Sequence, residues 1–177
     1  MEKARPVSLK EIRIRDNFWD KYRRLVREEI LKYQWCAMND QIEGAPKSHC
    51  IENFRIAAGE KQGEFYGAVF QDSDVAKWLE AVAYTLAEKP DKELKKLADS
   101  VIELIGRAQE PDGYFNTYFI LKEPGQRFRN LREGHELYTL GHMIEAAVAY
   151  KRATGEKRFL EIVQKMADLV ANTFGVE

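Results

Sequence analysis

The chain has 177 residues, of which 45% are hydrophobic and 32% charged, so it can bury one core and remain soluble. Its 28 basic and 29 acidic residues give a formal net charge of -1, which excludes the basic excess of a dedicated nucleic-acid surface. No apolar run has bilayer-spanning length and no signal peptide is visible, so we expect a cytoplasmic protein that binds neither nucleic acid nor membrane.

The first 15 residues are expected to form an extended lead-in to a helical domain. Apolar and polar side chains alternate at the end of residues 7–15, which is typical of a short strand or an extended segment. Asp16 or Asn17 can cap the following helix, because short polar side chains accept hydrogen bonds from the first free N–H groups. Apolar side chains then recur at helical spacing to about Met38. Residues 16–177 are predicted to form one incomplete helical domain.

The middle of the chain predicts a loop and three further helices. Residues 39–47 contain glycine and proline and are predicted to form the loop. Ser48 is a candidate cap for a short helix that ends at Gly59. The next helix is predicted to begin at Ser73 or Asp74 and to end at a proline-containing break, after which a partner helix carries its own apolar stripe.

The last third predicts a long loop and another pair of helices. A Pro-Asp-Gly turn opens the loop, which covers residues 111–132 and carries Tyr114, Phe115, Tyr118 and Phe119. Loops of this length are uncommon unless they are functional. One helix is expected over residues 134–153, and a final helix begins after Gly155 and ends at Gly175.

Two short sequences recur in the two halves of the chain. Ala-Val-Ala-Tyr closes a helix at residues 81–84 and again at 147–150, and Leu-Ala-Asp at 97–99 is matched by Met-Ala-Asp at 166–168. Each half therefore consists of a long loop, a helix, a tight turn and a second helix. Because one helical hairpin cannot bury both of its faces, repeated hairpins stack on one another. We therefore predict an all-α fold, an α/α toroid with its pocket at the loop end.

Two polar-aromatic clusters stand where a loop enters a helix. The first begins with Phe70 and Gln71 and continues as Asp-Ser-Asp, and the second, residues 132–138, contains His135. Helix capping accounts for serine and aspartate but leaves Phe70 and Gln71 unexplained, and an aromatic face beside an amide is a common way to hold a sugar ring. His135 can donate to a sugar hydroxyl, or it can be a capping or core histidine hydrogen-bonded to a backbone carbonyl. One substrate site built from both clusters is predicted.

The remaining histidine and cysteine residues are given structural or open interpretations. His142 shares a helix face with His135 and is predicted to be a buried, hydrogen-bonded core histidine, since this spacing is too long for one metal ion. The two cysteines are too few for a disulfide framework or a complete thiolate metal site. Cys36 is predicted to be a structural thiol, and Cys50, next to His49, is the better reactive candidate.

The carboxylates do not identify an acid–base pair. Glycosidases commonly use two carboxylic acids that flank the scissile bond. No pair in this sequence stands in a context that marks it for that role, and Asp72 with Glu136 is the choice if one must be made.

Four strings in the chain resemble a known family. They are Phe-Arg-Ile-Ala-Ala-Gly at 54–59, Gly-Ala-Val-Phe-Gln-Asp-Ser-Asp-Val-Ala-Lys-Trp-Leu-Glu-Ala at 67–81, Ala-Gln-Glu-Pro-Asp-Gly-Tyr at 108–114, and His-Glu-Leu-Tyr with Gly-His-Met-Ile-Glu-Ala-Ala-Val-Ala-Tyr at 135–150. With them, nearly the whole chain resembles the N-terminal part of glycoside hydrolase family 127, the β-L-arabinofuranosidases. The resemblance implies helical hairpins that form part of an (α/α)6 barrel, and retaining hydrolysis of β-L-arabinofuranosides.

The resemblance also implies which parts of the site this chain carries. The family's nucleophile is a zinc-bound cysteine thiolate, its acid/base is a glutamate, and its zinc ligands are cysteines and a glutamate. All of these lie beyond residue 177, so no catalytic residue and no metal ligand is expected within this chain, and zinc is expected only in the full-length enzyme. The positions that match sugar-contacting groups are Phe70, Gln71 and His135, which would form one wall of the pocket for an L-arabinofuranoside or related small saccharide.

Three functions remain open from the sequence. The first is the N-terminal portion of an arabinofuranosidase, inactive by itself and expected to self-associate through helix faces that lack their partners. The second is a non-catalytic helical-hairpin module that binds a carbohydrate or another protein. The third, another α/α-barrel enzyme such as an unsaturated uronyl hydrolase or a sugar epimerase, explains the fold but not the Phe-Gln-Asp-Ser-Asp string.

Overall fold

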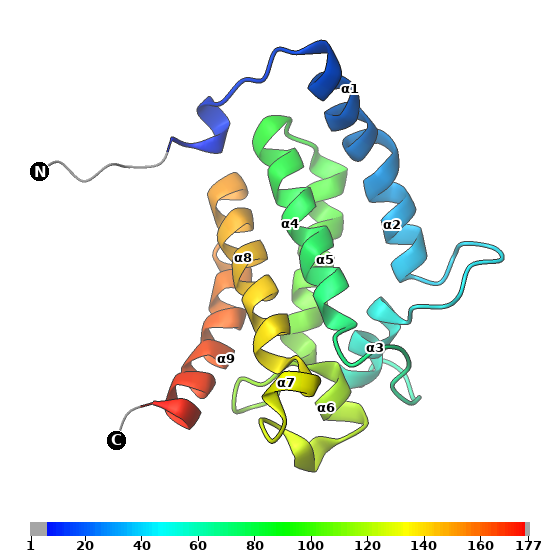
Figure 1. The fold of residues 1–177 in the computed structure, drawn as a ribbon, viewed down its shortest axis with the longest axis vertical. Helices are drawn as coiled ribbons and strands as arrows, with labels where there is room; N and C mark the ends of the chain where they lie inside the picture. The colour runs from blue at the N-terminus through cyan, green and yellow to red at the C-terminus, as the bar shows by residue number, and fades with distance from the viewer. Residues whose placement is uncertain (1–6, 176–177) are drawn as a thin grey trace, which may run out of the picture.

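A computed structural model describes residues 7–175, and every regular element within them is helical. Four long helices dominate, namely α4 (Asp72–Glu88), α5 (Lys92–Ala108), α8 (Glu136–Thr154) and α9 (Arg158–Phe174). Figure 1 shows α4 and α8 side by side, each followed by a helix that runs back in the opposite direction. The predicted all-α fold and the two helical hairpins are therefore confirmed.

The N-terminal part of the chain is a 3-10 turn followed by one long, continuous helical rod. The turn is η1 (Leu9–Glu11), and the rod consists of α1 (Asn17–Leu25), the π-helical η2 (Val26–Ile30) and α2 (Leu31–Met38). Asp16 caps the rod, because its Oδ1 accepts hydrogen bonds from the backbone N–H groups of Phe18 and Trp19 at 2.8 and 2.9 Å. The predicted helix and its cap are confirmed.

The short strand considered for residues 7–15 is not formed. Ser8 Oγ accepts a hydrogen bond from Lys10 N–H at 3.3 Å and starts η1, and residues 12–16 have no regular structure. A strand needs a neighbouring strand for its backbone hydrogen bonds, and the described part of the chain offers none. The extended lead-in is thus interrupted by a helical turn, and its residues 1–6 lie outside the described residues.

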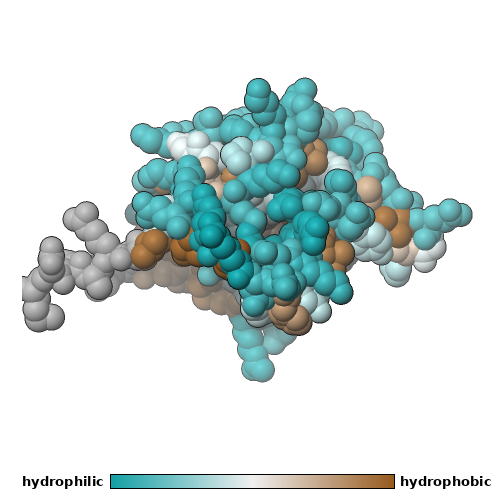
Figure 2. Space-filling model, turned by 90° about the horizontal axis from the view of Figure 1, so that it is seen from above, coloured by the Kyte–Doolittle hydropathy of each residue, from teal (hydrophilic) through white to brown (hydrophobic). Residues whose placement is uncertain are grey.

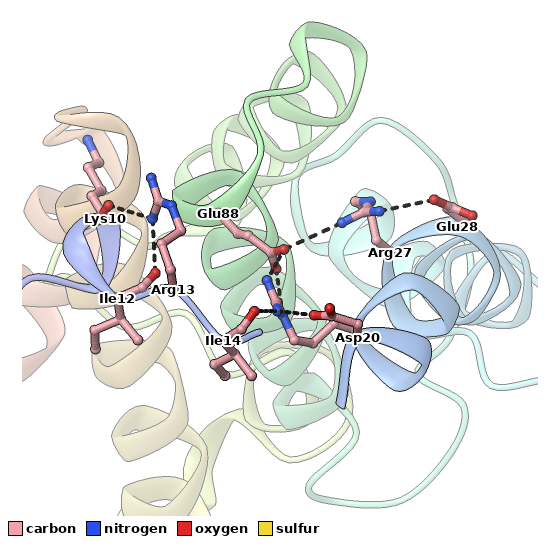
Figure 3. A network of polar contacts seen from close by, with 9 residues as sticks. Lys10, Ile12, Arg13, Ile14, Asp20, Arg27, Glu28 and Glu88 are labelled. Atoms are coloured by element: carbon pink, nitrogen blue, oxygen red, sulfur yellow. Dashed lines mark hydrogen bonds and ion pairs between the residues drawn. The ribbon is translucent and has the colours of Figure 1, made fainter. Parts of the chain in front are cut away.

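Ion pairs connect the lead-in and the rod to the end of α4. Arg23 Nε donates to Glu88 Oε2 at 3.2 Å, Arg23 Nη1 donates to the carbonyl of Ile14 at 3.0 Å, and Arg27 Nη1 lies 3.7 Å from Glu88 (Figure 3). Exposed ion pairs stabilise a fold little. Their consequence here is to fix the direction in which the N-terminal segment crosses the helices.

The short helices gather at the end of the molecule where α4 and α8 begin (Figure 1). They are α3 (Cys50–Ala57), α6 (Thr117–Leu121), η3 (Pro124–Gln126) and α7 (Leu131–Gly134). The loop predicted for residues 111–132 therefore contains regular structure. The residue before α3 is His49 in a left-handed conformation (φ 53°), which makes no side-chain capping bond, and the predicted cap Ser48 accepts a hydrogen bond from Cys50 N–H at 3.4 Å. The helix ends two residues before Gly59.

The core forms where α4 and α8 pack together, which is the most extensive helix–helix contact within the described residues. Four alanines of these helices are completely buried and allow the two backbones to approach closely: Ala76, Ala83, Ala146 and Ala147. Trp78 is also buried in this core, and its Nε1–H donates to the carbonyl of Leu31 at 3.0 Å. This bond joins α4 to the N-terminal rod.

The opposite end of the molecule is mainly hydrophilic. Seen from above, the centre of this face is covered by polar residues, and hydrophobic patches lie at its edges (Figure 2).

Within residues 7–175, none of the helices combines the length and the apolar content that crossing a bilayer requires.

Candidate functional site

The packing of α4 against α8 brings the two polar-aromatic clusters together. Both helices begin at the same end of the molecule, so Phe70, just before α4, meets His135, just before α8 (Figure 1). Their ring centroids are 5.3 Å apart with an angle of 55° between the planes. The Phe70 side chain is 41% exposed, which leaves an aromatic surface free at this junction. The two clusters therefore meet, and the substrate site predicted from them stays a prediction.

The amide of Gln71 is held in one orientation by three hydrogen bonds. Its Oε1 accepts from the backbone N–H of Ala68 at 3.1 Å, and its Nε2 donates to Cys50 Sγ and to Asp74 Oδ2, both at 3.0 Å. Both amide hydrogens are therefore used internally. One lone pair of Oε1 remains to accept a hydrogen bond from a ligand.

Gly67 makes this arrangement possible. Its φ of +110° lies in a region that favours glycine, and a Cβ there would be 2.7 Å from Gln71 Oε1 and 3.1 Å from the carbonyl oxygen of Ser48. A larger residue would therefore push the amide out of place.

Cys50 is a structural partner of Gln71, so the prediction that it is the better reactive thiol was wrong. Its side chain is 1% exposed, and burial raises the thiol pKa to about 11, so the thiol is protonated at neutral pH. The Sγ–H donates weakly to the backbone carbonyl of Gln71 at 3.8 Å, while Sγ accepts from its amide. The Cys50 thiol is therefore not expected to react, and it helps to position the Gln71 amide.

His135 occupies the junction between α7 and α8 in a left-handed conformation (φ 53°). Its ring makes no capping hydrogen bond to α8, and its Nδ1 lies 2.7 Å from the backbone carbonyl of Glu133. In the neutral ring that contact places the proton on Nδ1, so Nε2 is an acceptor, and it becomes a donor when the ring is protonated. The hydrogen bond to a backbone carbonyl that the structural alternative predicted is therefore present, although the side chain does not cap α8, and the same ring stands against Phe70.

Two further rings of α8 continue the surface that Phe70 and His135 begin. Tyr138 lies 5.8 Å from His135 and 4.6 Å from His142, measured between ring centroids, and Lys77 Nζ lies 5.3 Å from the centre of the Tyr138 ring. We call Phe70, His135, Tyr138 and His142 the aromatic wall. The sequence signal for its extension is the spacing of three and seven residues from His135, which puts all three side chains on one helix face.

His142 is therefore not the buried, hydrogen-bonded core histidine that was predicted. Its side chain is 26% exposed, and its Nδ1 lies 3.3 Å from Glu145 Oε2 without the geometry of a hydrogen bond. The adjacent Gly141 is exposed, and a Cβ there would meet no atom within 4 Å. The surface of α8 around His142 is therefore open in the described part of the chain.

A hollow of about 330 Å³ lies beside the aromatic wall, between α2 and α4. It is lined by Gln34, Ala37, Met38, Ser48, Cys50, Asp74, Lys77, Trp78 and Ala81. Asp74 bonds Gln71 and Lys77 lies over Tyr138, so these two side chains separate the hollow from the wall. The hollow and the wall are therefore neighbouring surfaces with these two side chains between them.

Asp72 and Glu136 are buried and bonded internally, so their choice as an acid–base pair was wrong. Asp72 is 2% exposed and accepts from Thr117 N–H at 2.7 Å and from its hydroxyl at 2.6 Å. Glu136 is 0% exposed and accepts from the Tyr114 hydroxyl at 2.5 Å and from Phe128 N–H at 2.7 Å. Burial raises the pKa of Asp72 to about 7 and also raises that of Glu136, although these hydrogen bonds oppose both shifts.

Stacked helical hairpins with a polar-aromatic surface at their loop end define a protein of the α/α-barrel class, and solved structures agree. A family 127 β-L-arabinofuranosidase from Geobacillus stearothermophilus T6 matches with a TM-score of 0.92 and 64% identity over 93% of this chain and 26% of that chain. A second solved β-arabinofuranosidase of that family gives a TM-score of 0.83 and 35% identity, over 94% and 27%. These structures have an (α/α)6 barrel, so the predicted barrel class is confirmed.

The chain belongs to glycoside hydrolase family 127, because the profile of the family's β-L-arabinofuranosidase catalytic domain matches residues 11–177. A curated relative, the non-reducing end β-L-arabinofuranosidase of Bifidobacterium longum subsp. longum, is 44% identical over 182 residues. That match covers 94% of this chain and 28% of the relative. The chain thus spans little more than a quarter of the length of the relatives it matches.

Proposed function

We propose that this chain is the N-terminal portion of a glycoside hydrolase that acts on β-L-arabinofuranosides, and that it contributes one wall of the sugar pocket. The main observation in support of the proposal is the contact between Phe70 and His135, where the first turns of α4 and α8 lie next to each other. This contact gathers an aromatic face, an imidazole and an oriented amide from two distant parts of a family 127 chain. Sugars are held by this combination of apolar faces and few placed polar groups.

Each of the three residues has a distinct role in this proposal. The exposed ring of Phe70 packs against the C–H face of the arabinofuranose ring. His135 Nε2 exchanges a hydrogen bond with one sugar hydroxyl, since its Nδ1 is already occupied by the Glu133 carbonyl. Gln71 Oε1 accepts from a second hydroxyl, and its internal hydrogen bonds keep it preorganised for that contact.

The zinc and the cysteine nucleophile that the family resemblance implies are assigned to the part of the enzyme outside this chain. Within residues 7–175 no group of three or more histidine, cysteine, aspartate or glutamate side chains could hold a metal ion. Cys50 is buried and protonated, whereas a zinc ligand must be a thiolate. The residues present therefore do not fit a zinc site, and their proposed work is to bind and orient the sugar.

Substitution of His135 and Phe70 in the full-length enzyme tests the proposal. His135→Asn removes the imidazole without backbone strain, because asparagine tolerates a positive φ, and His135→Ala is the companion variant. We expect His135→Asn and Phe70→Ala each to weaken binding of L-arabinose by roughly tenfold, as loss of a charged or well-placed contact does. Calorimetry measures the affinity, and elemental analysis measures a zinc content that should not change.

Two outcomes would contradict the proposal. Unchanged sugar affinity in both variants would remove the aromatic wall from the pocket and would favour a helical-hairpin module that binds another protein. Loss of zinc from either variant would show that these side chains support the metal and do not contact the sugar.

A further inference from the structure

The segment between α5 and α8, residues 109–135, is bonded to the first residue of both α4 and α8. Thr117 donates its N–H and its hydroxyl to the Asp72 carboxylate, at 2.7 and 2.6 Å. Glu136 accepts hydrogen bonds from the Tyr114 hydroxyl and the Phe128 N–H of the same segment, at 2.5 and 2.7 Å. We call residues 109–135 the bridging segment, because it connects the starts of the two helices.

Residues 113–117 of the bridging segment are buried, so this part of the segment transmits a displacement instead of absorbing it. The Arg127 guanidinium lies 4.0 Å from the centre of the Tyr114 ring and donates to Asp112 at 3.1 Å. Gly113 is pressed against the backbone of α9, where a Cβ would lie 2.7 Å from the carbonyl oxygen of Lys165. Tyr114 is completely buried.

Each carboxylate directly follows a proposed sugar-contacting residue in the sequence. Gln71 precedes Asp72, and His135 precedes Glu136. Neither Gln71 nor His135 caps its helix with a side-chain hydrogen bond, whereas the carboxylate that follows each of them ties its helix start to the bridging segment. A small rotation at either carboxylate would therefore move the adjacent site residue.

A role in stability alone accounts poorly for these two groups. Buried charges are expensive to desolvate, and well-packed apolar residues often replace them with equal or greater stability. A carboxylate that served only the helix dipole could remain in water, whereas Asp72 and Glu136 are buried. What the carboxylates add is orientation, because each accepts two hydrogen bonds from fixed directions.

We propose that Asp72 and Glu136 are positioning residues that fasten the bridging segment to both inner helices and so set Gln71 and His135 at a fixed distance. The proposal rests on the proposed function of these neighbours as sugar contacts. Because one segment carries both attachments, loosening either of them alters both halves of the aromatic wall.

The test uses conservative and disruptive variants of Glu136 in the full-length enzyme. Glu136→Gln preserves both hydrogen bonds, since an amide accepts from Phe128 N–H and donates to the Tyr114 hydroxyl, whereas Glu136→Ala removes both. We expect Glu136→Ala to weaken L-arabinose binding by roughly tenfold or more, the scale of a misplaced contact. Glu136→Gln should stay within about threefold of the unmodified enzyme. Glu123→Ala, a carboxylate in the same segment that accepts from the Tyr118 hydroxyl and not from α4 or α8, is the matched control and should bind normally.

Two milder variants keep the proposal testable if Glu136→Ala fails to fold. Tyr114→Phe removes one hydrogen bond to Glu136, and Thr117→Val removes one to Asp72 without touching α8. Thr117→Val is the more informative variant, because it changes only the attachment at the start of α4. It should nevertheless shift the NMR signals of the His135 ring at the start of α8. Weaker sugar binding with such a shift supports the proposal.

Three results would overturn it. The first is a folded Glu136→Ala enzyme, or a folded pair of milder variants, with unchanged sugar affinity. The second is Glu136→Gln as weak as Glu136→Ala, which would make charge and not geometry responsible. The third is normal binding in His135→Asn and Phe70→Ala, which would remove the site itself. If those site variants bind weakly while the Glu136 variants bind normally, the positioning role fails and the proposed function stands.

Discussion

At the scale of single residues, Asp72 makes the fold sensitive to pH in an unusual direction. Its carboxyl pKa is 3.8 in a solvated reference and about 7 in the folded protein, chiefly because of burial. Between these values the folded state binds more protons than the unfolded state, so the free energy of unfolding falls as pH rises from about 4 to 7. Most paired carboxylates have the opposite effect, since their pKa is lowered on folding.

Asp72→Asn should therefore reduce the pH dependence of stability. Asparagine has nearly the same shape, accepts from Thr117 N–H and donates to the Thr117 hydroxyl, but it does not titrate. The Asp72 contribution to the difference between pH 4 and pH 8 is at most roughly 4 kcal/mol, from the size of the pKa shift. Urea unfolding of both proteins at the two pH values measures it. Equal pH dependence in the two proteins would show that Asp72 is not buried as a titrating group.

Cys50 should be inert toward alkylation although its neighbour in sequence is a histidine. The thiol is buried and has a pKa of about 11, so it forms little thiolate at pH 8. Cys36 is partly exposed on α2 and should be labelled first by iodoacetamide. Mass spectrometry of the folded and the urea-unfolded protein distinguishes the two sites. Equal labelling of both cysteines before unfolding would contradict the burial of Cys50.

At the scale of elements, the turn that enters α4 depends on Gly67. Gly67→Ala brings a Cβ within 2.7 Å of Gln71 Oε1, so the amide must leave its hydrogen bonds to Cys50 and Asp74. Gly44→Ala is a matched control, because Gly44 has a positive φ of 76° but no atom lies within 4 Å of its Cβ position. Both changes should cost about 1–2 kcal/mol of stability from backbone strain.

Sugar affinity should separate these two glycine variants. We expect only Gly67→Ala to weaken L-arabinose binding in the full-length enzyme, by a few-fold, since one preorganised hydrogen bond is lost. Calorimetry with L-arabinose, combined with thermal unfolding, measures both effects. Equal losses of affinity in the two variants would remove Gln71 from the proposed site.

At the scale of the whole molecule, α1 presents an apolar face that no other described element covers. None of its residues is buried, and Phe18 and Trp19 are 59% and 57% exposed. Exposed apolar patches of this kind mark surfaces that contact other protein. We propose that the 177-residue chain by itself associates through α1, and that in the longer enzyme this face packs against the remaining part of the barrel.

Substitutions on the two faces of α1 test this association. Phe18→Ser with Trp19→Ser should reduce both the binding of a hydrophobic dye and the association seen by sedimentation, because the apolar area is removed. Arg24→Ala, an exposed residue on the opposite face of the helix, is the control and should leave both unchanged. A monomeric, dye-free chain without any substitution would contradict the proposal and favour a self-contained module.

The helices and their pairing were predictable because their signals are local. Asp16 caps the first helix as expected, and the break after α4 and the end of α9 lie where proline and glycine indicated. The predicted loop over residues 111–132 was less accurate, since it holds short helices. Segments as short as α6 depend on contacts with the rest of the fold and carry little periodicity.

By itself, the sequence determined the all-α class, the hairpin repeat, the family and the two clusters that meet at the helix starts. Only the tertiary structure decided that Cys50 is buried, that His142 is partly exposed, and that Asp72 and Glu136 are held internally. The physical reason is that capping and periodicity act over a few residues, whereas burial and pKa depend on partners far along the chain. Thr117, which bonds Asp72 from a different segment, could not be assigned to it before the helices were packed.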